Sequence, residues 1–261
     1  MNADLAFLHC RHDAQCVARV DKHFEGYCSL QWMEQGAVDL SYDSEKYQLR
    51  AEHGTTWFWP AFPGPHIRFH LARDQHSWNH RYAAFTGPRL ESWKRAGLWH
   101  EKPQTGPRGE EHRASFDEML ALIQRGGPWG TRRAIHVLER LLLELAEARA
   151  AQQVEAQWLE RSREFLSQTR DFSPNYAALA RELGLGLSTL RRHFKAATGL
   201  SLHDALLQNR LDAARQLLGE TELPLKQVAA QLGYRDVYFF SNQFKKLSGV
   251  TPTAYRRSRQ Q

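Results

Sequence analysis

The stretch Leu179-Ala180-Arg181-Glu182-Leu183-Gly184 recurs about fifty positions later as Val228-Ala229-Ala230-Gln231-Leu232-Gly233. Each copy carries an alanine at its second position, Ala180 or Ala229, which leaves room for another helix to approach closely. Each copy also ends on glycine, the residue that most often adopts the left-handed conformation closing a helix. Repetition at a fixed offset indicates that one structural unit is used twice. We therefore predict a helix ending at Gly184 and an equivalent helix ending at Gly233.

A second apolar stripe follows each copy of the repeat. Its members are Leu187, Leu190, Phe194 and Ala197, and fifty positions later Val237, Phe240, Phe244 and Leu247. The spacing i, i+3, i+7, i+10 puts four side chains on one helix face, which we predict to be buried. Two helices joined by a short glycine-bearing turn form a helix-turn-helix, whose second helix can enter a DNA major groove. The segment from Leu202 to Leu218 has Leu or Ala at core spacing and is expected to connect the two units.

The basic charge of the chain is concentrated in this region. The formal net charge is +6, and from Trp158 to Gln261 there are 16 Lys and Arg against 9 Asp and Glu. Basic charge confined to one part of a chain favours a polyanionic partner, because neutralised phosphates release condensed counterions. A solvated basic surface would produce the same count. Together with the repeat, the charge favours double-stranded DNA as the partner.

The helix faces opposite the apolar stripes supply the candidate DNA-binding residues. They are Ser188, Thr189, Arg191, Arg192 and Lys195 in the first copy, and Tyr238, Phe239, Ser241, Asn242, Lys245 and Lys246 in the second. We assign Lys195, Lys245, Lys246, Arg256 and Arg257 to phosphates, which position a protein without reading sequence. The alternatives are a solvated helix face and, for Tyr238 and Phe239, packing under the connecting helix.

The run from Asp236 through Phe239-Phe240-Ser241, Phe244-Lys245-Lys246, Gly249, Thr251-Pro252 and Tyr255-Arg256 resembles the signature of the AraC/XylS family of bacterial regulators. The resemblance covers about the last hundred residues. It implies that Ser188, Arg191 and Arg192 read bases, and an arginine there can bond guanine in a bidentate manner. The family often has Tyr and Arg where this chain has Phe239 and Asn242, so sequence specificity is expected to rest mainly on the first unit. The resemblance also implies activation rather than repression, with RNA polymerase as a partner.

The N-terminal part has a different pattern. Up to about residue 100, short segments such as 26–32, 37–42 and 47–51 are separated by turn residues, which predicts a β-sandwich or small barrel. Residues 101–113 are expected to be a connection. From Ala114 the period becomes helical, and a helix over 131–153 places Ile135, Leu138, Leu142 and Leu145 on a two-heptad seam. That seam predicts dimerisation, with an ordinary packed helix as the alternative.

Members of the AraC/XylS family commonly carry a cupin-like β-barrel that binds a small effector, followed by dimerisation helices. The resemblance therefore implies an α+β chain with an effector-binding domain over 1–112, a helical dimerisation and linker region over 113–156, and an all-α domain over 157–261. Residues 54–66 resemble the cupin turn, and Trp78-x-His80-x-Tyr82 resembles the strand that carries ligand-facing residues in sugar-binding members.

The effector pocket implied by this resemblance consists of His80 and Tyr82, with His66 and Trp57 behind them and Gln31 as a further hydrogen-bonding group. Aromatic faces and directional hydrogen bonds suit a sugar or another polar ring compound. The alternative is that these aromatic side chains fill the core of the barrel.

Two arrangements of metal-capable side chains are weighed against this interpretation. His23, Glu25, His66 and His70 would serve a metal-dependent cupin enzyme, and His9, Cys10, His12 and Cys16 would serve a metal or redox sensor. Neither set has the ligand spacing usual for such sites. We therefore expect no catalytic residues, metal or cofactor. The lack of a signal segment or a long apolar run, with three cysteines that cannot all pair, predicts a cytoplasmic protein without a membrane span.

Overall fold

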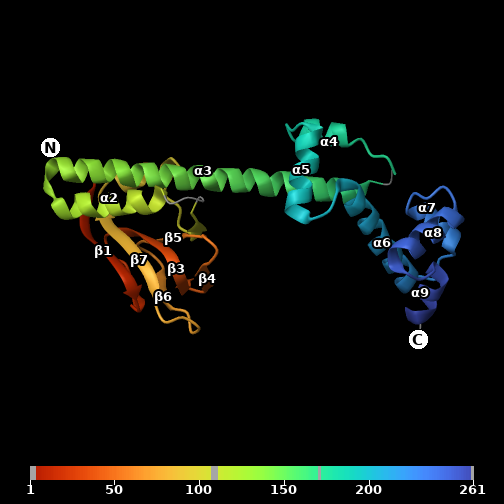
Figure 1. The fold of residues 1–261 in the computed structure, drawn as a ribbon, viewed down its shortest axis with the longest axis horizontal. Helices are drawn as coiled ribbons and strands as arrows, with labels where there is room; N and C mark the ends of the chain where they lie inside the picture. Colours follow the sequence, from red (N-terminus) through yellow and green to blue (C-terminus); the bar gives the residue numbers. More distant parts are fainter. Residues whose placement is uncertain (1–3, 107–110, 170–171, 260–261) are drawn as a thin grey trace. The chain divides into compact units, whose positions relative to one another are not determined.

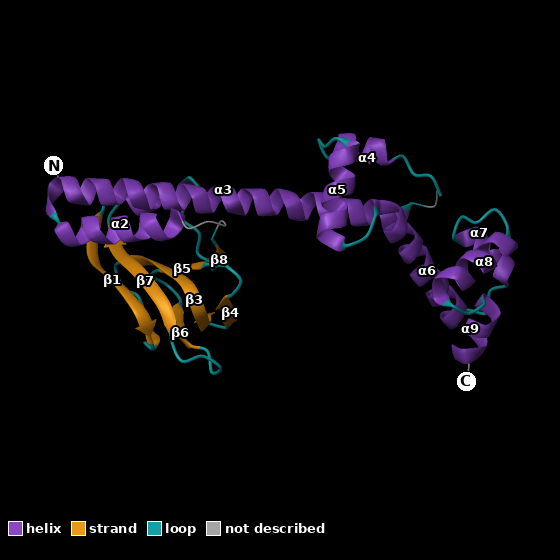
Figure 2. Cartoon of the chain, in the orientation of Figure 1, coloured by secondary structure: helices purple, strands orange, loops and turns teal. Residues whose placement is uncertain are grey.

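The computed structural model describes residues 4–106, 111–169 and 172–259 of the chain (Figures 1 and 2). It divides into two compact units, Met1–Gln152 and Gln153–Gln261. The strands are β1 Ala6–Cys16, β2 Val20–His23, β3 Cys28–Tyr42, β4 Glu45–Ala51, β5 Trp57–Ala61, β6 His66–Leu71, β7 Trp78–Thr86 and β8 Gln104–Thr105. The helices are α1 Arg89–Arg95, α2 Glu111–Arg125, α3 Gly127–Gln168, α4 Tyr176–Glu182, α5 Leu187–Thr198, α6 Leu202–Glu220, α7 Leu225–Gln231, α8 Val237–Ser248 and α9 Pro252–Arg259.

The N-terminal unit is built on β3, which is long enough to belong to two antiparallel sheets. Its first half pairs with β5 and β7, and β7 in turn pairs with β1. Its second half pairs with β4 and β6, and β6 pairs with β2. The strand changes sheets at Gly36, next to a register shift between Met33 and Gln35. A Cβ atom on Gly36 would lie 2.7 Å from the carbonyl oxygen of Ser77, so only glycine permits this close approach.

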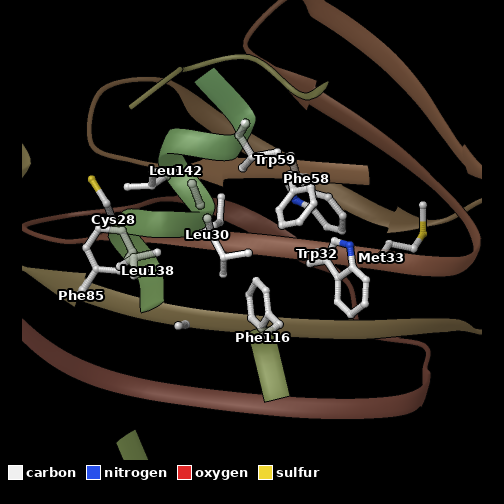
Figure 3. Close-up of a cluster of buried hydrophobic side chains, with 14 of the residues drawn as sticks. Cys28, Leu30, Trp32, Met33, Phe58, Trp59, Phe85, Phe116, Leu138 and Leu142 are labelled. Carbon is white, nitrogen blue, oxygen red and sulfur yellow. The ribbon is translucent and has the colours of Figure 1, made fainter. Parts of the chain in front are cut away.

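Two helices cover one face of the β1-β7-β3-β5 sheet. Figure 1 shows α2 and the first part of α3 lying along this face. Figure 3 shows Leu30, Trp32 and Phe58 from the sheet meeting Phe116 of α2 and Leu138 of α3 in one cluster of buried side chains. The Trp32 and Phe116 rings are stacked, with centroids 5.8 Å apart. These five side chains are therefore buried between the sheet and the two helices.

The predicted dimer seam of α3 is used within the chain. Ile135, Leu138, Leu142 and Leu145 are all buried in the core of the N-terminal unit. A side chain packed against its own sheet is not available to a second copy, so the seam does not predict a dimer interface. The alternative, an ordinary packed helix, describes these four residues.

Helix α3 also continues further than the sequence predicted. A helix over 131–153 was expected, whereas α3 runs without a break from Gly127 to Gln168. Residues 146–157 are mostly Ala, Glu, Gln and Arg, with neither Gly nor Pro, and these residues favour an uninterrupted helix. Residues 150–157 are exposed, and the boundary between the two units falls among them.

Four N-terminal elements differ from what the sequence predicted. The segments 26–32 and 37–42 are halves of the single strand β3. Strands β1 and β2 and helix α1 were not predicted, because polar and charged residues interrupt their apolar pattern. The predicted connection over 101–113 contains β8 and the start of α2, and its residues 107–110 lie outside the described part of the chain.

The C-terminal unit is helical and has two apolar clusters. The first joins Trp158 and Leu166 of α3 with α4, α5 and the first half of α6. The second joins the second half of α6 with α7, α8 and Tyr255 of α9. Helix α6 has 19 residues, or about 28 Å at 1.5 Å per residue, so each half of it serves one cluster. In the described part of the chain, no helix has the length and apolar character to cross a membrane.

Candidate functional site

The two copies of the repeat fold as two helix-turn-helix units, α4 with α5 and α7 with α8. Gly184 and Gly233 end the first helix of each unit with φ of 67° and 82°, the left-handed conformation that the repeat predicted. The first helix is capped in one unit only, where the Asn175 side chain accepts a hydrogen bond from the Ala178 amide at 3.0 Å. The second unit has its side-chain cap on α8, where Asp236 accepts a hydrogen bond from the Phe239 amide at 2.7 Å.

The predicted buried stripes are confirmed over their first two turns. Leu190 and Phe194 are buried in α5, and Phe240 and Phe244 are buried in α8. The fourth position of each stripe was predicted wrongly, since Ala197 and Leu247 are exposed. Neither residue belongs to the apolar cluster that buries the first two turns of its helix. A stripe counted from sequence continues to the end of its helix, whereas burial also requires a packing partner from another helix.

Most of the candidate DNA-binding side chains lie on the exposed faces of α5 and α8. Ser188, Arg191, Arg192, Lys195, Tyr238, Phe239, Asn242, Lys245 and Lys246 are exposed, and Thr189 and Ser241 are half-buried. Within the described residues, none of the arginines and lysines in this set has an acidic partner within ion-pair distance. Other cations of the same unit are paired, such as Arg161 with Glu182 at 2.7 Å and Arg215 with Asp212 at 3.1 Å. The basic groups of α5 and α8 therefore keep their charge free for a polyanion.

Arg256 differs from the other residues that we assigned to phosphates. It is half-buried, and its guanidinium donates a hydrogen bond to the carbonyl oxygen of Leu223 at 2.6 Å. This bond ties α9 to the segment before α7. Arg257 is exposed. The structure thus gives Arg256 a role in holding the second unit together.

A second candidate site is a cavity of about 210 Å³ in the N-terminal unit. Alternate residues of adjacent strands line it, because successive side chains of a strand point to opposite faces. The lining residues are His9, Arg11, Asp13 and Cys16 of β1, Ala18, Val20 and Lys22, Phe24 and Tyr27, Ser29 and Gln31 of β3, Phe69 of β6, and His80 and Tyr82 of β7. The walls are mainly apolar, with charged groups from β1 and β2.

His80 lies buried at this cavity. Its Nε2 is 2.8 Å from Oε1 of Gln31, its Nδ1 is 3.7 Å from the Cys16 sulfur, and its ring is stacked on Trp59. Burial lowers the pKa of His80 to about 3, so the ring is neutral at neutral pH. Since the Gln31 oxygen can only accept, Nε2 carries the proton and Nδ1 accepts from the Cys16 thiol. The imidazole is thereby held in one tautomer and one orientation.

The structure brings three of the five predicted effector residues to the cavity and leaves two outside it. His80, Tyr82 and Gln31 line it, whereas His66 and Trp57 do not. His66 begins β6, where its Nε2 lies 3.0 Å from Asp21. The indole of Trp57 donates to the carbonyl oxygen of Arg50 at 2.9 Å. Proximity in sequence to a cupin-like turn did not determine which way these side chains point.

Strand β1 supplies the cavity residues that sequence reasoning missed. His9, Cys10, His12 and Cys16 were predicted as metal-capable neighbours, but the strand places His9 and Cys16 in the cavity lining and Cys10 and His12 outside it. His9 faces the cavity, while the Cys10 sulfur lies 3.9 Å from the Leu120 carbonyl of α2. His12 lies 3.0 Å from the Asn79 side chain. The alternation of His9, Arg11 and Asp13 was the signal that could have identified β1 as a cavity wall.

The other metal-capable set is also dispersed. The rings of His23 and His66 are tilted against each other with centroids 4.8 Å apart, while the Nδ1 of His70 lies 2.9 Å from the carbonyl oxygen of Leu71. Among the residues that the structure describes, no three His, Cys, Asp or Glu side chains gather as a metal site.

Strands β3 and β7 form a wall between the cavity and helix α2. Gln31 and His80 face the cavity, and their neighbours Trp32 and Arg81 face the helix. The Arg81 side chain is 4% exposed and binds Asp117 of α2 at 2.6 Å and Glu34 at 2.8 Å. Its guanidinium lies 4.8 Å from the ring centre of Trp32. Consecutive residues of one strand therefore contact the cavity and the helix.

Comparison with known proteins gives matches that lie mainly in the C-terminal part. Residues 179–258 match the family model described as "Helix-turn-helix domain". The chain is 41% identical over 63 residues to a probable transcriptional regulator, LumQ, of Photobacterium leiognathi, covering 24% of this chain and 25% of that protein. It is 29% identical over 155 residues to the arabinose operon regulatory protein of Escherichia coli, covering 56% of this chain and 53% of that protein. The chain thus spans between a quarter and about half of the length of these relatives.

Among solved structures, the C-terminal domain of AraT, a response regulator from Geobacillus stearothermophilus, is 32% identical with a TM-score of 0.37, and the match covers 39% of this chain and 85% of that one. A transcriptional regulator with an AraC-type DNA-binding domain from Chromobacterium violaceum is 25% identical with a TM-score of 0.38, and the match covers 43% of this chain and 97% of that one. The duplicated sequence unit, its two-unit fold and the family match agree. Residues 179–258 of this chain therefore form a helix-turn-helix domain, and the relatives that match it are named as transcriptional or operon regulators.

Proposed function

We propose that the chain is a transcription regulator, not an enzyme, that binds double-stranded DNA through α5 and α8. The observation that carries this proposal is a set of cations, on the exposed faces of the second helices of both units, that have no acidic partner among the residues the structure describes. Arg191, Arg192, Lys195, Lys245 and Lys246 are all exposed. When such a cation binds a DNA phosphate, condensed counterions are released and no existing ion pair of the protein has to be broken.

The DNA-binding proposal predicts a steep dependence on salt. In a mobility-shift assay with DNA from upstream of its own gene, the affinity of the full chain should fall by orders of magnitude between low and physiological salt. Lys245→Ala should weaken binding to all sequences about equally and reduce the salt slope by about 0.9. Arg192→Ala should instead cost about 1–3 kcal/mol of preference at one base position.

The matched control is Arg215→Ala. Arg215 lies on α6 of the same unit and is paired with Asp212, so its loss should leave both affinity and salt slope nearly unchanged. Binding that does not depend on salt, or no binding at all, contradicts the proposed function. Identical behaviour of the Arg192 and Lys245 variants contradicts our division into base readers and phosphate contacts.

We further propose that a small effector occupies the cavity of the N-terminal unit, which we take to be cupin-like. Two of the relatives are regulatory proteins of the arabinose and xylose operons. The cavity supports a sugar or a similar polar ring, because aromatic walls from Tyr82 and Phe69 accompany the polar groups of Gln31 and His80. The shared wall of β3 and β7 supplies a physical route from the cavity to α2.

We also propose that the chain activates transcription, contacts RNA polymerase and forms a homodimer. The dimer would use side chains outside the buried seam, such as the exposed Trp129 and Leu143 of α3.

The effector proposal predicts a ligand-dependent rise in melting temperature that depends on the cavity. In a thermal-shift screen of sugars and aromatic acids, a hit should lose about tenfold in affinity in Tyr82→Phe, which removes one hydrogen-bonding hydroxyl. Tyr47→Phe is the control, since Tyr47 lies on β4 outside the cavity lining. His80→Ala should weaken the same hit further. A ligand that stabilises wild type, Tyr82→Phe and His80→Ala equally contradicts this assignment of the pocket.

A further inference from the structure

The two recognition helices, α5 and α8, agree in what they bury and differ in what they expose. At the fifty-residue offset, buried Leu190 and Phe194 correspond to buried Phe240 and Phe244. The exposed positions do not correspond in chemistry. Ser188 is replaced by Tyr238, and Arg192 is replaced by Asn242. The two units therefore present the same backbone scaffold with different side chains on the face that is free.

The exposed face of α8 combines an aromatic ring with an amide. The Tyr238 side chain is 81% exposed, and its ring makes no aromatic contact within the part of the chain that the structure describes. Asn242 lies four residues on, one helical turn away on the same face, and is exposed as well. The Asp236 cap at the start of α8 fixes the first turn from which Tyr238 projects. Tyr238 and Asn242 thus form an adjacent, solvent-facing pair.

Phe239 differs from Tyr238 although it follows directly. Its ring lies 6.0 Å from Phe172 and 5.9 Å from Tyr234, and it is 48% exposed. These contacts account for an aromatic residue at position 239 as packing within the second unit. No described aromatic residue packs on the Tyr238 ring in this way, so the apolar surface of that ring is open to a binding partner.

The charge around this pair selects the partner. Lys245 and Lys246 follow Asn242 on α8 and have no acidic partner among the described residues, as reported above. A duplex offers phosphates to these lysines and base edges to the side chains between them and the start of the helix. In the major groove, the side-chain amide of asparagine matches the N6 donor and N7 acceptor of adenine, and an apolar contact matches the C5 methyl of thymine. Arginine matches the O6 and N7 acceptors of guanine.

We propose that α8 reads A·T base pairs, with Asn242 bonding adenine and the Tyr238 ring contacting a thymine methyl, while α5 reads guanine through Arg192. This inference rests on the proposed function, in which both helices enter the major groove. It gives the second unit a part in sequence recognition. Of the two DNA segments that one chain contacts, the one at α5 would be read at guanine and the one at α8 at adenine and thymine. Each operator segment should therefore contain an A·T-rich part and a part with a required guanine.

The proposal is tested with synthetic duplexes that lack single groups on the bases. The preferred duplex is first obtained by selecting binders of the full-length protein from random sequence. Replacing one thymine by uracil removes only the methyl group, and replacing one adenine by 7-deazaadenine removes only the N7 acceptor. We expect about a fourfold loss for the critical methyl and about a tenfold loss for the critical N7. Substitution with 7-deazaguanine should have its largest effect in the other part of the duplex.

Variants then connect each group on the DNA to one side chain. Tyr238→Ala should bind the thymine and uracil duplexes equally, whereas Tyr238→Phe, which keeps the ring, should still prefer thymine. Asn242→Ala should bind adenine and 7-deazaadenine duplexes equally, and Arg192→Ala should do the same for guanine and 7-deazaguanine. All of these side chains are exposed, so unchanged melting temperatures are expected and serve as the check on folding.

The outcomes separate this proposal from the one on which it rests. If the protein selects no duplex from random sequence, the proposed function fails. If it selects one and Tyr238→Ala still discriminates thymine from uracil at every position, the thymine contact is overturned while DNA binding stands. Likewise, a preference for adenine over 7-deazaadenine that persists in Asn242→Ala overturns the adenine contact.

Discussion

Replacing Arg81 by methionine is expected to destabilise the N-terminal unit by about 3 kcal/mol. The Arg81 side chain is 4% exposed and forms ion pairs with Asp117 and with Glu34, which is itself 10% exposed. Removing one partner of a buried pair leaves an uncompensated charge, which generally costs about 3–5 kcal/mol. The lower end applies here because Glu34 keeps a second partner, Arg113, at 2.6 Å.

The loss is measured by urea unfolding followed through tryptophan fluorescence. Seven of the eight tryptophans lie within Met1–Gln152, so the signal reports on this unit. Arg19→Ala is the control, since Arg19 is 75% exposed and 3.9 Å from Asp21, and it should change the stability by less than about 1 kcal/mol. Equal effects of the two variants would show that the Arg81 cluster does not hold α2 against the sheet.

The second large effect is expected from Phe244→Ala, which should destabilise the second helix-turn-helix unit by about 3–5 kcal/mol. Phe244 is 2% exposed, and its ring lies 5.9 Å from Phe240 and 5.6 Å from Tyr255. Truncation removes the side chain that holds α8 to α9. Since the first apolar cluster does not include these residues, α5 should keep its place.

A nuclease-protection assay shows which part of the DNA contact is lost. Phe244→Ala should lose protection over the part read by α8 and keep the part read by α5, and Phe194→Ala should show the reverse. Leu247→Ala, at a position that is 39% exposed, is the matched control and should retain the full footprint. Loss of the whole footprint in both phenylalanine variants would mean that the two clusters fold as one unit, contrary to this prediction.

The C-terminal unit was predictable to the level of single residues because its information is local. Helix ends depend on a glycine that adopts positive φ, and buried faces depend on a 3.6-residue period, and both are visible in any short window of sequence. The second copy of the repeat then showed the same helix-ending glycine and the same apolar stripe, which supported both predictions. The errors, at Ala197 and Leu247, fall in the last turn of each helix, where burial depends on whether another helix packs there and not on the period of the helix itself.

The N-terminal unit was predictable only in outline. Turn residues predicted a β-rich fold, and Trp78-x-His80-x-Tyr82 led to two cavity residues. Strand β1 was missed because its alternation places His9 and Arg11 on one face and Cys10 and His12 on the other, so neither face is uniformly apolar. Its pairing partner β7 lies about seventy residues away, a separation at which local patterns carry no information about register.

The sequence alone thus determined the existence, order and buried faces of two helix-turn-helix units, because periodicity and glycine placement act within one or two helical turns. Only the tertiary structure decided which side chains line the N-terminal cavity and that His66 and Trp57 lie outside it. It also decided that the seam residues of α3 are buried in the core of the N-terminal unit. Those outcomes depend on strand register and on which surfaces of distant segments bury each other. The direction in which each side chain points depends on strand pairing with residues that are distant in the sequence, so a short stretch of sequence cannot reveal it.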